Sequence, residues 1–403
     1  MNSELKHTTA YDYERKHNGT GPSVTNRSKI IAADSIKAEE IPTIPIDSLE
    51  LVTSLQPTIN IHSIDIASFR NLPTPLVVQP SEYRRSLSEW FQIWWEGIRP
   101  GYLSLSLLPI LLGTTLAWTH TVNAQAPLGR LNIGHMIGGI VVASLIQIGG
   151  HLINDYYDHI RGIDTGNRLS SGGLIQQRYI KPTFVLKMGF TLLGIGTFLG
   201  LLFSIGGGIL TYLFGGLIVL GTYLYSAPPH PLSSIALGEI TGFIFFGPLL
   251  TLIAYMAQTS GSIPVSAFIY SLLPGLLATA VIHTNNLRDS ETDTNAQKRT
   301  LAYLLGTKAS RFVYLLLLSA AYVIVAILGL PPHTPHLILI TFWTCPLLII
   351  VINGIMRTKS PIGFHLVMCE TLRIQLYFML LLIVSLIITT FIPVLPHLPS
   401  HLL

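Results

Sequence analysis

The chain has 403 residues, of which 49% are hydrophobic and only 11% are charged, and its mean hydropathy is +0.54. An average soluble domain carries about 25% charged residues, so this composition excludes a soluble globular protein and indicates an integral membrane protein. The net charge of +4 and the pI near 9.0 do not indicate a nucleic-acid-binding protein. The basic residues lie in short loops between apolar runs, where membrane topology alone explains them.

Residues 1–80 are polar, mix acidic and basic side chains and show no persistent helical or strand period. They are predicted to form a disordered cytoplasmic tail. No basic start is followed by an apolar core, so no signal peptide is expected. Residues 81–97, which include Trp90, Trp94 and Trp95, are predicted to form an amphipathic helix at the membrane interface. The membrane domain is expected to cover residues 98–395.

Nine apolar segments follow, each near the roughly 20 residues that cross a bilayer as a helix. The predicted fold is therefore all-α: a multi-pass bundle of nine transmembrane helices. Prolines within the spans are expected to kink helices without ending them, because packed neighbours can satisfy the freed backbone groups. The predicted spans are 101–119, 133–153, 183–203, 206–226, 235–256, 264–284, 308–329, 334–355 and 372–393.

The distribution of charge predicts the orientation of the bundle. Beyond residue 80, every lysine and arginine except Arg130 lies before the first span, in the loops after the second, fourth, sixth and eighth spans, or just inside the flanking helix ends. These loops are expected to face the cytoplasm, and the location is predicted to be the plasma (inner) membrane. Most acidic residues beyond Glu96 fall on the same side, so one face of the bundle is expected to carry the chemistry.

Two acidic stretches have matching internal spacing. Asn154 and Asp158 are four residues apart, as are Asn285 and Asp289, and Asp293 follows after four more. Residues at this spacing share a face of a helix. The Asn-then-Asp spacing recurs 131 positions along the chain, after four more spans, which predicts two pseudo-repeated halves whose polar ends meet.

Carboxylate and amide oxygens, without cysteine or histidine, suit a hard cation such as Mg²⁺. Magnesium commonly bridges one or two carboxylates to substrate phosphates, so the two stretches are predicted to form one site for metal and diphosphate. Nearby basic residues would bind the remaining phosphate oxygens. The alternative is that these are solvated loop charges and helix caps, but both clusters share a side, a spacing and a following basic set. The basic residues are Arg161, Arg168, Arg288, Lys298 and Arg299.

These motifs resemble those of the UbiA-type intramembrane aromatic prenyltransferases, and the closest pattern is that of the 1,4-dihydroxy-2-naphthoate prenyltransferases of menaquinone synthesis. The resemblance covers about residues 90–395. The matching pieces are Arg99-Pro100, NDYYDHIRGIDTGNR at 154–168, Gly172-Gly173, GEITGFIFFGP at 238–248, and NNLRDSETD with KRTLAYLLG within 285–306.

The resemblance implies transfer of a polyprenyl group from a polyprenyl diphosphate to an aromatic acid. Two Mg²⁺ ions would be held by Asn154, Asp158, Asp289 and Asp293, with Asn285 added by its matching position, while Asp155 would orient the site or stabilise the cation. In the naphthoate branch the acceptor loses its carboxyl group. The partners implied are these two substrates and the lipid bilayer, with the oligomeric state left open.

The sequence departs from the family pattern at two places. The third Asp of the common first motif is replaced by Gly162, and Asp164 lies two residues further on, as in the naphthoate branch. The Lys that follows a loop Tyr in the benzoate relatives is absent after Tyr225. This argues against 4-hydroxybenzoate as the acceptor and leaves open which residue orients the acceptor.

Further residues have both a functional and a structural interpretation. Tyr156, Tyr157 and Tyr225 could stabilise a cation through their ring faces, but tyrosines at helix ends are often interfacial anchors. Arg99 could pair with the acceptor carboxylate or extend to the membrane interface. Glu239 is ionisable near a helix end in an apolar span and is predicted to be catalytic.

Three other functions compete with this prediction. A secondary transporter also has paired halves and intramembrane acids, but its acids tend to lie near the bilayer midplane. A lipid-phosphate alcohol transferase would carry a D-G-x-x-A-R motif, which is absent. Within the prenyltransferases, homogentisate, 4-hydroxybenzoate, chlorophyllide-like and glycerol-phosphate acceptors remain open.

Overall fold

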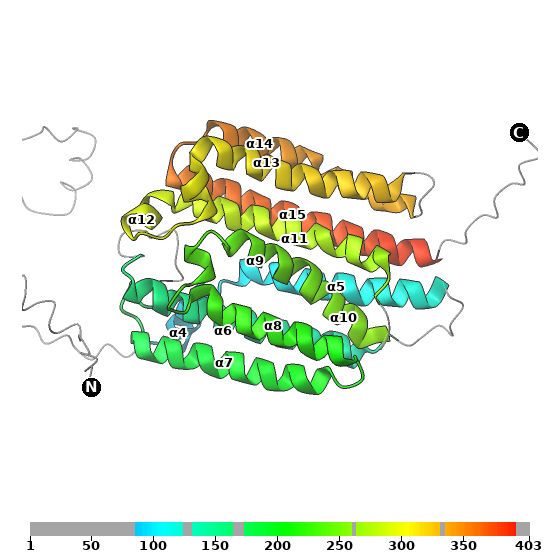
Figure 1. The fold of residues 1–403 in the computed structure, drawn as a ribbon, viewed down its shortest axis with the longest axis horizontal. Helices are drawn as coiled ribbons and strands as arrows, with labels where there is room; N and C mark the ends of the chain where they lie inside the picture. Colours follow the sequence, from blue (N-terminus) through cyan, green and yellow to red (C-terminus); the bar gives the residue numbers. More distant parts are fainter. Residues whose placement is uncertain (1–84, 124–130, 164–172, 260–262, 331–334, 392–403) are drawn as a thin grey trace, which may run out of the picture. The chain divides into compact units, whose positions relative to one another are not determined.

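The computed structural model describes residues 85–123, 131–163, 173–259, 263–330 and 335–391. Within these ranges the chain forms helices long and apolar enough to make nine membrane spans, and it contains no named strand (Figure 1). The predicted all-α bundle of nine spans is therefore confirmed. The predicted tail, residues 1–80, lies outside the described residues.

The spans follow the chain in order. They comprise α5 (Pro100–Asn123), α6 (Ile133–Ile160), α7 (Pro182–Phe203), α8 (Ile209–Ser226), the fifth span from α9 (Gly238–Ile244) through η6 (Phe245–Leu249) to α10 (Leu250–Thr259), α11 (Val265–Arg288), α13 (Leu301–Gly329), the eighth span from η7 (His336–Thr344) to α14 (Cys345–Arg357), and α15 (Pro361–Phe391). Three short helices accompany them, namely α4 (Leu87–Ile98), η5 (Leu232–Ser234) and α12 (Ser290–Asn295).

Helix starts follow local sequence chemistry. The Asn132 side chain accepts a hydrogen bond from the His135 amide at the start of α6, and Thr300 does the same for Tyr303 at the start of α13. Pro182 stands in the first turn of α7, where its missing N–H costs nothing. Helix α4 begins with a capping box between Ser86 and Glu89. It agrees with the amphipathic helix predicted over 81–97, while its location at the interface stays a prediction.

The prolines act differently from one another. Pro274 lies inside α11 without ending it. Pro248 lies in η6, a π-helical turn, where the backbone departs from regular α geometry. Pro346 stands in the first turn of α14, at the change from 3-10 to α-helix, so this proline begins a helix and does not kink one.

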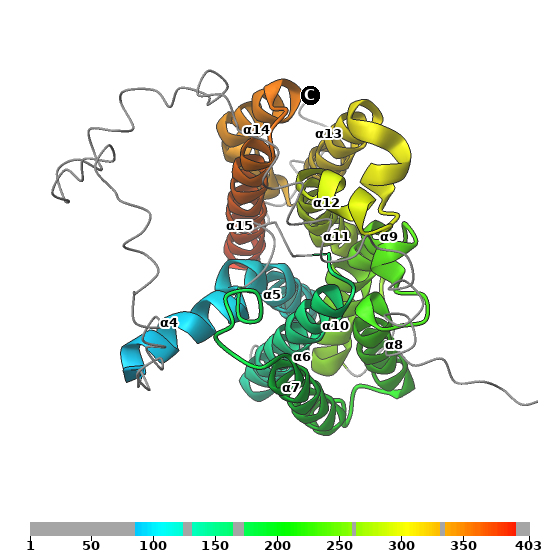
Figure 2. The same ribbon diagram turned by 90° about the vertical axis from the view of Figure 1, so that its left-hand side faces the viewer.

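The main apolar core surrounds α11. Leu273, Leu277 and Ala280 of this helix are fully buried against side chains of α5, α13 and α15. Close helix approach is set by glycine: a Cβ on Gly247 of η6 would lie 2.8 Å from the Gly275 Cα of α11. Seen along the helices, α13, α14 and α15 lie to one side of α11, and α6, α7 and α8 lie to the other (Figure 2). This second group surrounds the candidate site.

Candidate active site

Both acidic motifs lie at the same end of the bundle, on helices that extend beyond the predicted spans (Figure 1). Helix α6 continues to Ile160, so Asn154 and Asp158 lie on its last turns. Helix α11 continues to Arg288, and α12 carries Asp293 directly after it. Asp158, Asp289 and Asp293 all line one cavity. The two acidic stretches therefore come together in the structure, as predicted.

The first motif is held by hydrogen bonds across three elements. The Asn154 amide donates to Asp158 at 2.9 Å, and the Ser226 hydroxyl of α8 donates to Asn154 Oδ1 at 2.6 Å. Arg161 donates to Asp158 at 2.9 Å and to the Ser234 hydroxyl of η5 at 2.9 Å. These bonds fix the orientation of the Asp158 carboxylate at the cavity wall.

The second motif repeats this arrangement with a different arginine. Arg288 is 3% exposed and donates to both oxygens of Asp289 at 2.7 and 2.6 Å. The same guanidinium donates to Asn285 Oδ1 at 2.8 Å. A charge-assisted pair of this geometry is strong, so the side chains of Asn285, Arg288 and Asp289 form one preorganised unit.

Among the carboxylates of the site, that of Asp293 has the fewest hydrogen-bonding partners for its negative charge. It is fully buried, and neither of its oxygens accepts a hydrogen bond, while the Lys298 ammonium lies 3.4 Å from Oδ1. Burial raises the pKa of Asp293 to about 7, with the charge of Lys298 opposing that shift. Burial lowers the pKa of Lys298, but Asp158, Asp293, Tyr225 and Asp289 outweigh it and hold the pKa above its usual value. Lys298 is thus surrounded by the carboxylates of both motifs.

Arg99 forms an ion pair with Asp155, which lies within the first motif, directly after Asn154. It occupies a left-handed backbone conformation with φ of 56° at the end of α4, and its side chain lines the cavity. Asp155 is 1% exposed. The pair therefore connects the junction of α4 and α5 to α6, and places a guanidinium at the cavity.

Glu239 lies behind the cavity wall. Its Oε1 accepts a hydrogen bond from the Asn286 amide at 2.9 Å and lies 3.0 Å from His283 Nδ1. The other nitrogen of His283, Nε2, lies 3.0 Å from the Ser310 carbonyl oxygen. Asn286 lines the cavity, whereas Glu239 does not. Glu239 is thus connected to the cavity indirectly, through its hydrogen bond with Asn286.

The cavity has a volume of about 690 Å³ and extends from the motifs along the inner face of α6. Its wall on this helix follows helical spacing, with His135, Gly139, Gln147, His151 and Asp158 among its members. The distance from Asp158 to His135 is about 35 Å, at 1.5 Å rise per residue. Beyond the motifs the lining is mostly apolar, so the cavity has one charged end and one long apolar limb.

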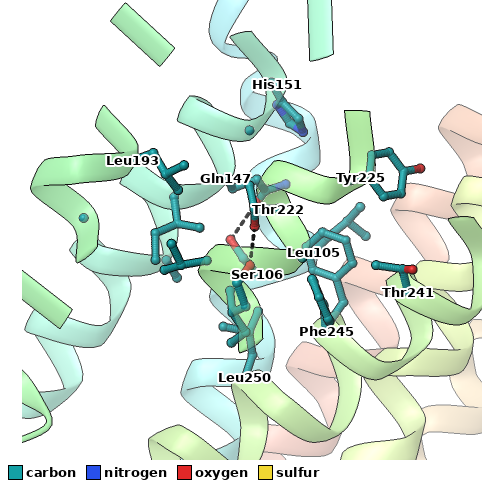
Figure 3. Close-up of a pocket in the computed structure, with 18 of the residues that line it drawn as sticks. Leu105, Ser106, Gln147, His151, Leu193, Thr222, Tyr225, Thr241, Phe245 and Leu250 are labelled. Carbon is teal, nitrogen blue, oxygen red and sulfur yellow. Dashed lines mark hydrogen bonds between the residues drawn. The ribbon is translucent and has the colours of Figure 1, made fainter. Parts of the chain in front are cut away.

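Polar side chains interrupt the apolar limb near the charged end (Figure 3). The Ser106 hydroxyl donates to Gln147 Oε1, and Gln147 Nε2 donates to the Tyr102 carbonyl at 2.8 Å. Tyr225 and Thr241 line the same region opposite Leu193. The Gln147 amide is therefore satisfied within the protein.

The structure brings some predicted site residues to the cavity and not others. Arg161, Arg288 and Asp155 pair with site residues without lining the cavity, and Arg299 is exposed outside it. Tyr156 packs toward α4 and α7, and Tyr157 stacks edge-on against it at 5.3 Å. Asp164 and Arg168 lie outside the described residues. The cavity-lining members of the prediction are Arg99, Asn154, Asp158, Tyr225, Asn285, Asp289, Asp293 and Lys298.

Ser226 and Asn286 belong to the site but are not among the residues that the sequence predicted. Ser226 is an isolated hydroxyl at the end of a span, and nothing in its spacing marks it. Asn286 stands beside Asn285, and only the rotation of α11 decides which of the two amides meets Glu239.

The oxygen set fits a divalent cation shared with a phosphate ligand. Among the described residues, no three Asp, Glu, His or Cys side chains form a closed metal site by themselves. Magnesium is usually held by one or two carboxylates, with substrate phosphates and waters completing its shell. The buried Asp293 oxygens without hydrogen-bond donors match that requirement.

Comparison with known proteins gives the family. The model of the UbiA prenyltransferase family matches residues 106–362. The 1,4-dihydroxy-2-naphthoate octaprenyltransferase of Bacillus subtilis is 28% identical over 300 residues, which are 74% of this chain and 94% of that protein. The enzyme of the same name from Haemophilus influenzae is 34% identical over 245 residues, 59% of this chain and 77% of that protein.

A solved structure of a UbiA homolog from Archaeoglobus fulgidus bound to GPP and Mg²⁺ has the same fold. Its TM-score is 0.51 at 16% identity, over 72% of this chain and 99% of that chain. The chain belongs to the UbiA prenyltransferase family and is a membrane-embedded prenyltransferase.

Proposed function

We propose that the enzyme transfers a polyprenyl group from a polyprenyl diphosphate to 1,4-dihydroxy-2-naphthoate, with Mg²⁺ as cofactor and loss of CO₂, to give demethylmenaquinol. The observation that carries the proposal is a single cavity with both acidic motifs at one end and an apolar limb behind them. The names of the relatives from Bacillus subtilis and Haemophilus influenzae support the naphthoate acceptor.

The charged end is suited to hold the diphosphate. Lys298 supplies an ammonium, and Arg161 and Arg288 keep the Asp158 and Asp289 carboxylates in place. Bound Mg²⁺ would be held by Asn154, Asp158, Asn285, Asp289 and Asp293, and would stabilise the charge of the leaving diphosphate. The apolar limb keeps water away from the allylic carbon once its bond to oxygen has broken.

Arg99 is placed to bind the acceptor carboxylate at the cavity. The allylic cation bonds to the ring carbon that carries the carboxylate. The bond to the carboxylate then breaks, its electron pair returns to the ring, and CO₂ leaves. Diphosphate is the other product, and no further reactant is needed. The charged end of the cavity faces the cytoplasm of the plasma membrane in this proposal, as the basic loops favour.

The test uses the full chain in lipid nanodiscs with Mg²⁺, octaprenyl diphosphate and carboxyl-labelled 1,4-dihydroxy-2-naphthoate. We expect labelled CO₂ and demethylmenaquinol in equal amounts. Asp158→Ala and Asp289→Ala are expected to lose activity by at least about 100-fold, as for other groups that stabilise transition-state charge. Glu291→Ala is the control, because Glu291 is exposed and lies off the cavity.

The same assay with homogentisate, 4-hydroxybenzoate and a chlorophyllide tests the other acceptors. Prenyl transfer to one of these without release of CO₂ from the naphthoate would replace the acceptor proposed here. Full turnover in both Asp variants would remove the proposed site.

A further inference from the structure

The cavity wall contains buried polar atoms that have no hydrogen-bond partner within the protein. Among the described lining residues, these atoms are Arg99 Nε, His151 Nδ1, Ser233 Oγ and both carboxylate oxygens of Asp293. The described lining includes no residue of α13, α14 or α15, so the groups that bind a ligand belong to the other elements. Because a buried polar atom without a partner costs free energy, such atoms indicate where the polar groups of a ligand bind.

Arg99 and His151 are held beside each other by two contacts. The Arg99 guanidinium pairs with Asp155, which lies four residues after His151 on α6. The His151 ring forms a hydrogen bond with the backbone of Ile98, the residue directly before Arg99. These contacts join the junction of α4 and α5 to one turn of α6. The two unpartnered nitrogens therefore belong to one part of the cavity wall.

The two nitrogens have opposite roles in hydrogen bonding. Arg99 Nε carries a hydrogen and is a donor, because the guanidinium stays protonated. Since His151 Nδ1 has no partner, the bond to Ile98 belongs to Nε2. A backbone carbonyl only accepts, so Nε2 carries the hydrogen and Nδ1 of the neutral ring is an acceptor. A cationic donor beside a neutral acceptor matches a carboxylate with a hydroxyl on the adjacent carbon.

His151 lies between the acids and the apolar limb. Along α6 it is about 10 Å from Asp158, at 1.5 Å per residue, which leaves space for the diphosphate and the allylic carbon. Gln147 lies one turn further from the acids (Figure 3), and its amide is already bonded to Ser106 and Tyr102. The Tyr102 ring packs edge-on against the His151 ring, with the centroids 6.1 Å apart, and holds its plane. On this wall His151 is therefore free to bond to the acceptor.

We infer that His151 orients the aromatic acceptor, with Nδ1 accepting a hydrogen bond from the hydroxyl next to the carboxylate that Arg99 binds. The inference rests on the proposed function. In 1,4-dihydroxy-2-naphthoate the 1-hydroxyl is next to the ring carbon that bonds to the prenyl group. It becomes a stronger donor as the ring gives electrons to the allylic cation, so this hydrogen bond is strongest in the transition state. In 4-hydroxybenzoate the hydroxyl lies across the ring from the carboxylate, away from Nδ1. His151 thus selects acids that carry an ortho hydroxyl.

Two isomeric naphthoates test this role. 1-Hydroxy-2-naphthoate keeps the hydroxyl beside the carboxylate, whereas 4-hydroxy-2-naphthoate carries it elsewhere on the ring. Their dissociation constants are measured by calorimetry on the full chain in nanodiscs, with Mg²⁺ and an unreactive prenyl thiodiphosphate present. The wild type is expected to prefer the 1-hydroxy isomer by about 10-fold, the effect of one buried hydrogen bond. His151→Phe should lose this preference with little change for the 4-hydroxy isomer. His151→Asn, which keeps an acceptor oxygen, should retain part of it.

His120→Phe is the matched control. The His120 ring is half-buried like that of His151 and lies 3.1 Å from the Tyr255 hydroxyl, but it does not line the cavity. This variant should leave the preference unchanged. The same preference in His151→Phe as in the wild type, or equal weakening of both isomers, would overturn the role of His151 and leave the proposed function intact. A wild type that binds neither isomer would instead contradict the naphthoate acceptor, and the inference with it.

Discussion

Glu239 Oε1 and His283 Nδ1 lie 3.0 Å apart, and both side chains are buried between α9, α11 and α13. His283 Nε2 faces the Ser310 carbonyl, so this nitrogen carries a hydrogen. Glu239 Oε1 therefore forms its hydrogen bond with the other ring nitrogen, Nδ1. Because the Asn286 amide donates to the same Oε1, the orientation of Asn286 at the cavity depends on this pair.

Glu239→Gln is expected to lower kcat about 10-fold, as for other outer partners of metal-site residues, with a small change in the KM of the donor. The glutamine oxygen cannot serve both Asn286 and His283 as a carboxylate does. Combining Glu239→Gln with Asn286→Ala should add little, because both changes remove the same interaction. Tyr314→Phe, in a distant buried pair with Thr371, is the additive control. Full additivity with Asn286→Ala would mean that Glu239 does not act through this amide.

Magnesium binding is expected to depend on pH. The pKa of Asp293 is raised from 3.8 to about 7, so a proton competes with the metal for this carboxylate below pH 7. The affinity for Mg²⁺, measured calorimetrically with an unreactive prenyl thiodiphosphate, is expected to fall from pH 8 to pH 6. Asp293→Asn should bind more weakly and lose this part of the pH dependence. Equal affinity of the wild type at both pH values would contradict the assignment.

The same shift affects the stability of the metal-free protein. The folded state holds its proton on Asp293 up to about pH 7, whereas the unfolded chain releases it near 3.8. The contribution of this group to the free energy of unfolding therefore falls as the pH rises from about 4 to 7, and is constant above. Thermal unfolding of wild type and Asp293→Asn across this range measures it, with the difference expected to grow toward pH 7. A difference that does not vary with pH would exclude a buried carboxyl of raised pKa.

Lys298→Met is expected to change the affinity for Mg²⁺ and the affinity for the prenyl thiodiphosphate in opposite directions. Removing the ammonium leaves the carboxylates of Asp158, Asp289 and Asp293 without their shared cation. Mg²⁺ alone should then bind more tightly, while the prenyl thiodiphosphate should bind about 10-fold more weakly because one charge-assisted contact is lost. Calorimetry of each ligand separates the effects. Weaker binding of both ligands would indicate a distorted site.

Arg99→Gln tests the carboxylate of the acceptor. If Arg99 binds that group, the KM of the acceptor should rise about 10-fold or more, while the KM of the donor changes little. Asp155→Asn removes its ion pair and serves as the comparison, because it leaves the guanidinium in place. Equal changes in both variants, confined to thermal stability, would assign Arg99 a purely structural role.

Much of the fold could be predicted, because a chain that crosses a bilayer forms long apolar helices, and these are visible in the sequence as long apolar runs. The start of α15 could not. The predicted span began at residue 372, but the helix begins at Pro361. The predicted span left out the stretch before residue 372, yet Phe364, Val367 and Thr371 of that stretch are buried, and Thr371 bonds to Tyr314. Such partners lie far away in sequence.

The site residues could be predicted where they share one face of a helix. The spacing of Asn154 and Asp158 placed both on one side, and the same period sets Tyr156 about 200° from Asn154, at 100° per residue, away from the cavity. The distinction between Arg288, buried beside Asp289, and Arg299, exposed, was not predictable. It depends on where α11 ends and how the chain returns to pair Ile235 with Arg299.

The absence of α13, α14 and α15 from the described cavity lining has a consequence for sequence variation. Substitutions in these three helices are expected to change how much folded enzyme accumulates, and not how each folded molecule performs. In saturation mutagenesis, substitutions on the two sides of α11 should therefore cause different kinds of defect. Defects on the far side should be relieved by low growth temperature, while those around α6 and α8 should persist at every temperature.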